Sequence, residues 1–359
     1  MKKATERTIL VTGGAGFVGS NLCLKLKERY PGYSIIAFDN LKRRGSELNL
    51  PEFQQKGVRF IHGDIRNAED LLAVGPFHVL VEASAEPSVL AGLDSDPTYV
   101  INNNLYGSIH CFNTCLRYKA DLIFLSTSRV YPIEKIEKAG FVEEASRFSF
   151  SPDQQIAGIS PEGISEELNL DGARSFYGST KLASELFIRE YAAFYGLKAA
   201  VTRCGVVAGP RQMGKTDQGV VTLWMARHYW KQPLKYIGYG GTGKQVRDLL
   251  HIDDLVDLID LQIHQIEPFE GKVYNAGGGL SNSASLLEMT AICEKITGNK
   301  IVITPEPATR QADLRIYITN NSNIHKAAGW TPKKSVEMIF SDIFGWIRTN
   351  EPQLKNILT

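Results

Sequence analysis

Residues 8–19 read TILVTGGAGFVG, and this stretch decides the fold. Its first five residues are β-branched or apolar, which predicts a buried strand. The glycines that follow, Gly13, Gly16 and Gly19, have the spacing of a dinucleotide-binding loop. In such a loop the first glycine begins the tight turn, the second lets the backbone approach a pyrophosphate, and the third lets a helix pack on the strand. We expect that helix over residues 20–30, with its N-terminus at the phosphates.

An acidic residue follows at the distance that such a loop requires. The next predicted strand, residues 34–38, ends at Asp39, which lies 20 residues after Gly19. A carboxylate at this spacing hydrogen-bonds the 2′-hydroxyl of the adenosine ribose, so the sequence favours NAD as the cofactor. Arg43 and Arg44 come soon after and could in principle bind the 2′-phosphate of NADP. Asp39 would repel that phosphate, and we therefore give the carboxylate more weight.

A second pattern, Tyr177-Gly178-Ser179-Thr180-Lys181, carries candidate chemistry. Positions i and i+4 share one face of a helix, so a phenol and an ammonium would lie one turn apart. A free tyrosine has a pKa of about 10, which is high for a base at neutral pH. Positive charge from Lys181 and from an oxidised nicotinamide would favour the phenolate. We therefore predict that Tyr177 is a general base.

Between and after these motifs, predicted strands alternate with helical segments. That alternation predicts an α/β protein with a Rossmann-type, doubly wound parallel sheet. Ligands bind at the carboxyl ends of such strands. The polar or small residues at those ends are Gly13, Asp39, Asp64, Ala83, Thr127 and Arg203. Residues 132–172, rich in Pro, Gly and Ser, read as a long excursion of the kind that is often functional.

Composition excludes several classes of protein. The chain has 359 residues, 43% of them hydrophobic, and a net charge of +1 from 40 basic and 39 acidic residues. Nothing in this balance favours nucleic acid or an anionic membrane as a partner, and no apolar run approaches the ~18 residues of a membrane span. The N-terminus lacks a secretory core. The five cysteines complete no metal site, and we expect them to be reduced packing residues of a cytoplasmic protein.

Taken together, these motifs resemble the extended short-chain dehydrogenase/reductases that act on nucleotide sugars. The resemblance rests on the glycine loop, Asp39, the Tyr-Lys pair, and the segments Gly63-Asp64-Ile65, Ser126-Thr127-Ser128-x-Val130-Tyr131 and Arg247-Asp248-x-x-His251. It implies that Thr127 hydrogen-bonds the reacting hydroxyl beside Tyr177 and that Lys181 also binds the nicotinamide ribose. It implies adenine contacts from Asp64 and Ile65, and the other predicted cofactor contacts are Phe17, Val18, Asn40 and Ala83.

The resemblance also implies a nucleotide-sugar site and an assembly. Arg247 would grip the diphosphate, a role suited to a guanidinium fork. The full predicted substrate set is Glu86, Ser128, Arg129, Arg211, Gln212, Arg247 and Arg315. We expect a cofactor domain of residues 1–204 plus about 250–278, and a substrate domain of residues 205–249 and 279–359. By resemblance, helices near 104–118 and 177–195 would form a homodimer.

In the family that this chain resembles, the two residues after the catalytic Thr distinguish dehydratases from epimerases. The 4,6-dehydratases have an Asp-Glu pair there, whereas this chain has Ser128-Arg129, so epimerisation through a transient ketone is favoured over dehydration. Residues 209–219 and 243–251 are similar to those of the CDP-paratose (CDP-tyvelose) 2-epimerases. Tyr131-Pro132 and residues 83–88 depart from that subfamily, so inversion at carbon 4 of a UDP-hexose stays open. A net oxidoreductase and a non-catalytic NAD-binding protein are the remaining alternatives.

Overall fold

The computed structural model describes residues 7–93, 95–214 and 218–358. A seven-stranded parallel sheet lies at the centre of this described part, in the order β14-β10-β5-β4-β1-β2-β3. This confirms the predicted α/β class, and the strands predicted at residues 8–12 and 34–38 are present to within one residue at their ends. The strands are β1 (Thr8–Thr12), β2 (Ser34–Asp39), β3 (Arg59–His62), β4 (Val79–Glu82), β5 (Asp121–Thr127), β10 (Ala199–Cys204) and β14 (Val273–Ala276).

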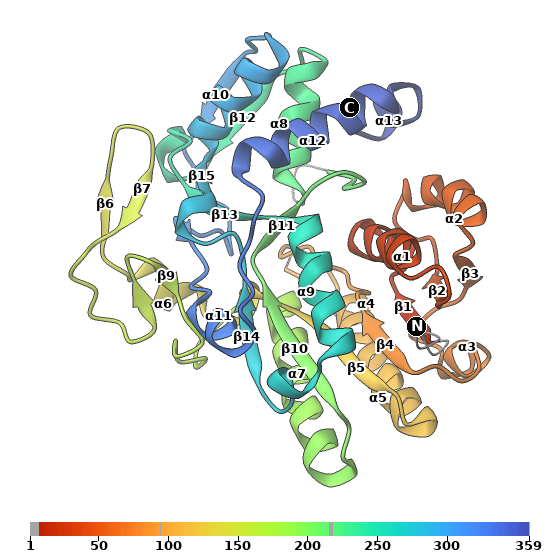
Figure 1. Ribbon diagram of the computed structural model, residues 1–359. Coiled ribbons are helices and arrows are strands. Elements are labelled where there is room, and N and C mark those ends of the chain that lie inside the picture. Colours follow the sequence, from red (N-terminus) through yellow and green to blue (C-terminus); the bar gives the residue numbers. More distant parts are fainter. Residues whose placement is uncertain (1–6, 94, 215–217, 359) are drawn as a thin grey trace.

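Helices cover both faces of this sheet (Figure 1). Successive strand residues point to opposite faces, so Ile9 and Val11 pack in one apolar layer and Leu10 packs in the other. The first layer contains side chains of α1 (Phe17–Arg29), α2 (Leu50–Lys56), α9 (Ile252–His264) and α11 (Ser322–Ala328). The second layer contains those of α3 (Ala68–Leu72), α5 (Gly107–Tyr118) and α7 (Phe176–Tyr195).

The first helix begins three residues earlier than the sequence pattern predicts. We expected it over residues 20–30, but α1 starts at Phe17, directly after Gly16, and ends at Arg29. A Cβ atom on Gly19 would lie 2.2 Å from the carbonyl oxygen of Gly13. The absence of that atom lets the first helical turn sit against the loop, so the glycine motif is itself part of the helix.

A second apolar core belongs to the later part of the chain. Figure 1 shows its helices grouped on one side of the central sheet. They are α8 (Val220–Tyr229), α10 (Leu286–Thr297), α12 (Val336–Thr349) and α13 (Glu351–Leu358). Beside them lie a small sheet of β11 (Val206–Ala208), β13 (Val246–His251), β15 (Ser283–Ser285) and β17 (Ile316–Tyr317), and a parallel pair of β12 (Leu234–Ile237) and β16 (Ile303–Glu306).

The predicted excursion over residues 132–172 is a packed element. It contains α6 (Ile133–Glu137) and two hairpins, β6 (Phe141–Glu143) with β7 (Phe148–Phe150) and β8 (Ile159–Ser160) with β9 (Gly163–Ile164). Side chains such as Phe148 and Ile164 share a buried cluster with Ile316 and Tyr317 of β17. The excursion therefore packs against the later part of the chain, on the left of Figure 1.

The structure contains no cysteine pair and no membrane-spanning helix within its described residues. All five cysteines are free and buried. Across 7–93, 95–214 and 218–358, no helix combines the length and the apolar character needed to cross a bilayer. The same residues hold no cluster of three His, Cys, Asp or Glu side chains arranged for a metal ion.

Candidate active site

A cavity of about 510 Å³ opens along the carboxyl ends of the central strands. Its wall contains most of the residues that the sequence singled out. From the predicted cofactor and catalytic sets these are Gly13, Gly16, Phe17, Val18, Asp39, Asn40, Ile65, Ala83, Thr127, Tyr177 and Lys181, and from the predicted substrate set they are Glu86, Arg211 and Gln212.

The glycine loop forms one end of the cavity, with its backbone close to the neighbouring strand. Gly13 has φ +64°, and a Cβ atom there would lie 2.8 Å from the carbonyl oxygen of Ala83. Only glycine meets both conditions. The Gly16 amide donates to the Gly13 carbonyl at 3.0 Å, which closes the turn before α1. This cradle fits the pyrophosphate of a dinucleotide at a helix N-terminus.

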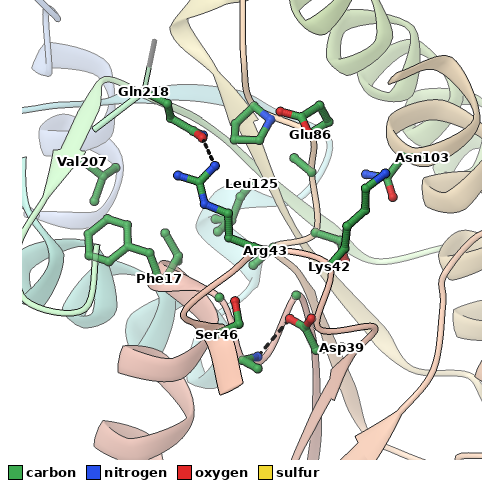
Figure 2. Close-up of a pocket in the computed structure, with 18 of the residues that line it drawn as sticks. Phe17, Asp39, Lys42, Arg43, Ser46, Glu86, Asn103, Leu125, Val207 and Gln218 are labelled. Carbon is green, nitrogen blue, oxygen red and sulfur yellow. Dashed lines mark hydrogen bonds between the residues drawn. The ribbon is translucent and has the colours of Figure 1, made fainter. Parts of the chain in front are cut away.

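Asp39 lies at the end of β2, next to this loop (Figure 2). Its carboxylate accepts hydrogen bonds from the amides of Ala15, at 3.1 Å, and Leu41, at 2.8 Å. Burial raises the pKa of Asp39, and these amides oppose the rise. A carboxylate already positioned by backbone donors is well suited to receive a ribose hydroxyl.

Of the two arginines weighed for a 2′-phosphate, Arg43 lines the cavity, with its guanidinium hydrogen-bonded to other residues, and Arg44 does not. Arg43 donates to the side chain of Gln218 at 2.8 Å and to the carbonyl of Met213 at 2.5 Å. Figure 2 shows Arg43 and Lys42 leaving the same loop in different directions, with Asp39 below them. Arg44 is exposed and absent from the cavity wall. The residues at this end therefore fit NAD.

Sequence reasoning missed Asn49, which links two parts of the cavity. Its side-chain amide donates to the carbonyl of Ala15 at 2.9 Å and its oxygen accepts from Arg211 at 2.8 Å. Arg211 also pairs with Glu52 at 2.6 Å. Arg211, predicted to bind substrate, thus lies beside the glycine loop. No motif spacing marks Asn49, because its role depends on a contact with a residue 162 positions away.

Thr127 and Tyr177 form the opposite end of the cavity. Thr127 is the last residue of β5, and Tyr177 is the second residue of α7, whose start is capped by Ser175. Burial raises the pKa of Tyr177 to about 12, and the neighbouring Thr127 side chain opposes this rise.

The expected phenolate relied on the positive charges of both Lys181 and an oxidised nicotinamide, and this shift describes the protein without the nicotinamide. The Lys181 ammonium lies 3.1 Å from the carboxylate of Glu82, at the end of β4, and both side chains are buried. The opposite charges of such an ion pair nearly cancel in their effect on the pKa of the Tyr177 phenol. Without a cofactor, burial therefore dominates and Tyr177 keeps its proton.

Glu86 faces the cavity from the loop after β4, whose backbone is fixed by Asn104. The Asn104 side chain accepts from the Glu86 amide at 2.8 Å and donates to the Glu86 carbonyl at 3.0 Å. Asn104 belongs to a π-helical turn (Asn102–Tyr106) between α4 (Thr98–Ile101) and α5. Such turns are frequent at functional sites. The predicted continuous helix from residue 104 is therefore interrupted where it supports the site.

Two predicted cofactor residues lie off the cavity wall. Gly19 packs beneath Gly13, as described above. Asp64 accepts from Asn40 at 2.9 Å and pairs with Arg66 at 2.6 Å, and these contacts hold the pKa of its carboxyl well below its usual range. Asp64 thus positions Asn40, which does line the cavity.

The remaining predicted substrate residues also lie off the cavity wall, and two of them, Arg129 and Arg247, form a cationic pair near Tyr177. Ser128 and Arg129 follow Thr127 in a short 3₁₀ turn, and Arg129 donates to the carbonyl of Ala312 at 3.1 Å. Burial and the charge of Arg247 lower the pKa of Arg129 to about 10. Arg247 pairs with Asp313 at 2.7 Å. Two close guanidinium groups with one carboxylate are arranged to bind an anion.

Arg315 lies further from the cavity. Its guanidinium stacks on Phe141, 4.0 Å from the ring centroid, and lies 4.0 Å from a carboxylate oxygen of Glu137. Phe148 and Tyr239 complete an aromatic surround. The structure thus places Arg315 among side chains of the excursion, at a greater remove than Arg129 and Arg247.

A cavity with this cofactor end and this pair of hydroxyl groups defines an enzyme that works with a bound dinucleotide. The chain belongs to the NAD dependent epimerase/dehydratase family, whose model matches residues 9–277. NAD is accordingly its cofactor.

Individual relatives span nearly the whole chain. It is 29% identical to a CDP-paratose 2-epimerase of Salmonella typhi, over 94% of this chain and 98% of the relative. Its fold matches a UDP-glucose 4-epimerase of Thermotoga maritima with UDP-glucose, at a TM-score of 0.77 and 26% identity, over 96% and 99% of the two chains. It also matches a UDP-glucose 4-epimerase of Thermus thermophilus in complex with NAD, at a TM-score of 0.74 and 26% identity, over 95% and 99%.

Proposed function

We propose that this protein is an isomerase that inverts carbon 2 of a CDP-sugar of the paratose/tyvelose type with NAD retained in the site. The observation that carries the proposal is the presence of Thr127 and Tyr177 together in the cavity wall, with Ser128-Arg129 and no acid pair directly after Thr127. Elimination of water needs an acid and a base at the sugar, and these two positions supply neither. The full-length similarity to a CDP-paratose 2-epimerase supports the CDP-sugar.

The proposed chemistry assigns a separate role to each residue. NAD, which the glycine loop and Asp39 would hold, would supply reversible hydride transfer at the carbinol carbon. Tyr177 takes the hydroxyl proton and gives it back, while Thr127 hydrogen-bonds the same oxygen. Lys181 binds the nicotinamide ribose. Arg129 and Arg247 bind the diphosphate, with the sugar between them and Tyr177.

An alternative is a UDP-hexose 4-epimerase, which would use the same residues. It is supported by the folds of the UDP-glucose 4-epimerases named above. A net oxidoreductase is less well supported, and it would consume added cofactor in proportion to product. A non-catalytic NAD-binding protein is less well supported again, because Tyr177, Lys181 and Thr127 are all present.

We further propose a cytoplasmic homodimer that supplies a sugar for polysaccharide biosynthesis. The dimer is supported by large apolar side chains exposed on α7 and the π-helical turn. These are Leu186, Phe187, Phe194, Tyr195 and Tyr106, of which Phe194 is 76% exposed. An apolar helix face of this kind is covered in most soluble proteins. For the domains we keep the division at about residues 204, 250 and 278, with Glu86, Gln212 and Arg315 among the substrate contacts.

Proton NMR of the purified protein with CDP-paratose, and in parallel with UDP-glucose, tests the proposal without added NAD. A new anomeric signal from the CDP-sugar supports 2-epimerisation with retained cofactor. Conversion of UDP-glucose alone overturns it in favour of a 4-epimerase. Consumption of added NAD in proportion to product indicates an oxidoreductase.

A further inference from the structure

Lys181 and Glu82 form an ion pair beneath the catalytic end of the cavity. Their side chains are 1% and 0% exposed, and Nζ lies 3.1 Å from Oε2. The ammonium also lies 3.9 Å from the centroid of the Phe124 ring. The second carboxylate oxygen, Oε1, has no hydrogen-bond partner among the described residues. Burial raises the pKa of Glu82, and the charge of Lys181 is the largest effect that opposes this rise and keeps the carboxylate ionised.

Glu82 occupies a place where a charge is unusual. It ends β4, in the middle of the sheet, paired in register with Thr12 of β1 and Phe124 of β5. Central strands of a parallel sheet are normally apolar, and carboxylates are seldom fully buried unless paired. Glu82 does not line the cavity, although the next four residues along the chain do. Neither the packing of a central strand nor a direct contact with a ligand in the cavity explains why residue 82 is a glutamate.

We propose that Glu82 is a positioning residue that acts on Tyr177 through Lys181, an inference that rests on the proposed function. Glu82 draws the ammonium toward the sheet and offsets its charge, so that Tyr177 remains protonated in the cofactor-free protein. The ammonium has three N–H donors, so Lys181 can bind a ribose hydroxyl while it keeps its contact with Glu82. Glu82 thus limits the effect of the Lys181 charge on the phenol.

The other groups that face Tyr177 make Glu82 the decisive negative charge. From α7 itself comes Lys181, from the turn after β5 comes Arg129, and from β10 comes the thiol of Cys204. Arg129 favours the phenolate, whereas Glu82 disfavours it. Burial raises the pKa of Cys204 to about 12, so that thiol is neutral. On the far side of the pair, the thiol of Cys111 on α5 is also buried, and burial raises its pKa.

The first test is Glu82→Gln, which keeps the shape and removes the charge. The acidic limb of the pH profile of kcat/KM, which reports the ionisation of Tyr177, should move to lower pH by about one unit. This is the shift expected from the loss of one nearby negative charge. Glu82→Asp should keep the limb of the parent protein, because it keeps the charge. The control is Asp257→Asn, which breaks the ion pair of Asp257 with Arg29 away from the cavity wall and should leave the limb unmoved. An unmoved limb in Glu82→Gln, or an equal shift in Glu82→Asp, overturns the proposal.

A second readout needs no substrate. With 3-fluorotyrosine placed at position 177, ¹⁹F NMR of the cofactor-free protein follows the phenol directly through a pH titration. Glu82→Gln should lower its pKa by about one unit relative to the parent protein, because the charge of Lys181 is no longer offset. The double variant Lys181→Gln/Glu82→Gln carries no unpaired buried charge and should return the pKa to near that of the parent, a comparison that stands if Glu82→Gln alone does not fold. An unchanged pKa in Glu82→Gln, or a pKa in the double variant about one unit or more from the parent's, overturns the proposal. If no sugar is converted but this titration behaves as described, the proposed function fails and the role of Glu82 stands.

Discussion

Arg203 at the end of β10 and Glu185 on α7 form a buried ion pair directly behind the catalytic residues. Nη2 and Oε2 are 2.7 Å apart, and the side chains are 3% and 1% exposed. The Ser126 hydroxyl donates to the same carboxylate at 2.5 Å. Because Ser126 precedes Thr127, and Glu185 lies two turns beyond Tyr177 on α7, this pair ties the strand and the helix that carry the reacting hydroxyl groups.

Loss of one partner of this pair should strongly destabilise the protein. Glu185→Ala leaves the Arg203 guanidinium buried without its carboxylate, which should lower the free energy of unfolding by about 3–5 kcal/mol. The double variant Glu185→Leu/Arg203→Met should lose less than the single variant, because no unpaired charge remains. Urea unfolding followed by circular dichroism measures both. Additive losses in the double variant would contradict the coupling.

Removal of the Tyr177 hydroxyl should abolish turnover without loss of the cofactor. Tyr177→Phe removes the general base, and kcat should fall by about 10²–10⁴-fold. Thr127→Val, which removes the hydrogen bond to the same oxygen, should reduce kcat less. Rates by NMR and the absorbance of NAD released on denaturation provide the two measurements. Loss of bound NAD from Tyr177→Phe would instead indicate a binding role.

Asp39 should set the preference for NAD over NADP. Asp39→Ala removes a charged acceptor for the ribose hydroxyl, so the affinity for NAD should fall by roughly 10–100-fold. Affinity for NADP should change less, because a repulsive charge is lost as well. Isothermal titration of the cofactor-free protein with each dinucleotide checks this, with the exposed Arg44→Gln as control. A similar loss of NAD affinity in the control would refute the assignment.

Two glycines in helices provide a matched pair. A Cβ atom on Gly178 of α7 would lie 2.0 Å from the carbonyl oxygen of Arg129, whereas one on Gly345 of α12 would meet nothing within 4 Å. Gly178→Ala should displace the turn after Thr127 and reduce both activity and stability, the latter by about 1–3 kcal/mol. Gly345→Ala should stabilise the protein by roughly 0.5–1 kcal/mol. Thermal unfolding and NMR rates distinguish the two, and equal effects would contradict the packing argument.

Local patterns were enough to predict the sheet. Each central strand is a short apolar run bounded by polar or turn residues, and the positions of Gly13, Asp39, Thr127 and Tyr177 around one cavity follow from parallel topology. The spacing of the motifs was therefore enough to predict most of the residues that line the cofactor and catalytic ends of the cavity. The family that these motifs resemble is also the one whose model matches residues 9–277.

What the sequence did not disclose depends on contacts between distant segments. The pairing of Lys181 with Glu82 joins residues 99 positions apart, and it limits the effect of the Lys181 charge on Tyr177. The apolar residues that pack the excursion, such as Phe148 and Ile164, are scattered among Pro, Gly and Ser, so that segment resembled a loop. The ion pair between Arg247 and Asp313 could not be predicted from the sequence, because 66 positions separate the two residues.

Stability should fall as the pH drops below about 6.5, the ordinary pKa of histidine. His228 on α8 is fully buried, its Nδ1 lies 2.8 Å from the carbonyl oxygen of Trp224, and Nε2 has no partner among the described residues. Burial lowers the pKa of His228 in the folded protein, and burial likewise lowers that of His251. The unfolded chain then binds more protons than the folded one, so acid favours unfolding from about pH 6.5 down to the folded pKa.

His228→Leu should therefore reduce the dependence of stability on pH, by up to about 1.4 kcal/mol per pH unit for the one group removed. Urea midpoints at pH 7.5 and pH 5.5 measure the slope in the parent and the variant. His325→Gln, on an exposed side chain of α11, is the control for one fewer histidine. A slope in His228→Leu that equals the parent's would mean that His228 is protonated in the folded protein at pH 5.5, with Nε2 hydrogen-bonded to water. If the slope falls in His228→Leu, we expect His251 to account for the pH dependence of stability that remains. Among the described residues, His251 is the other histidine whose pKa burial lowers.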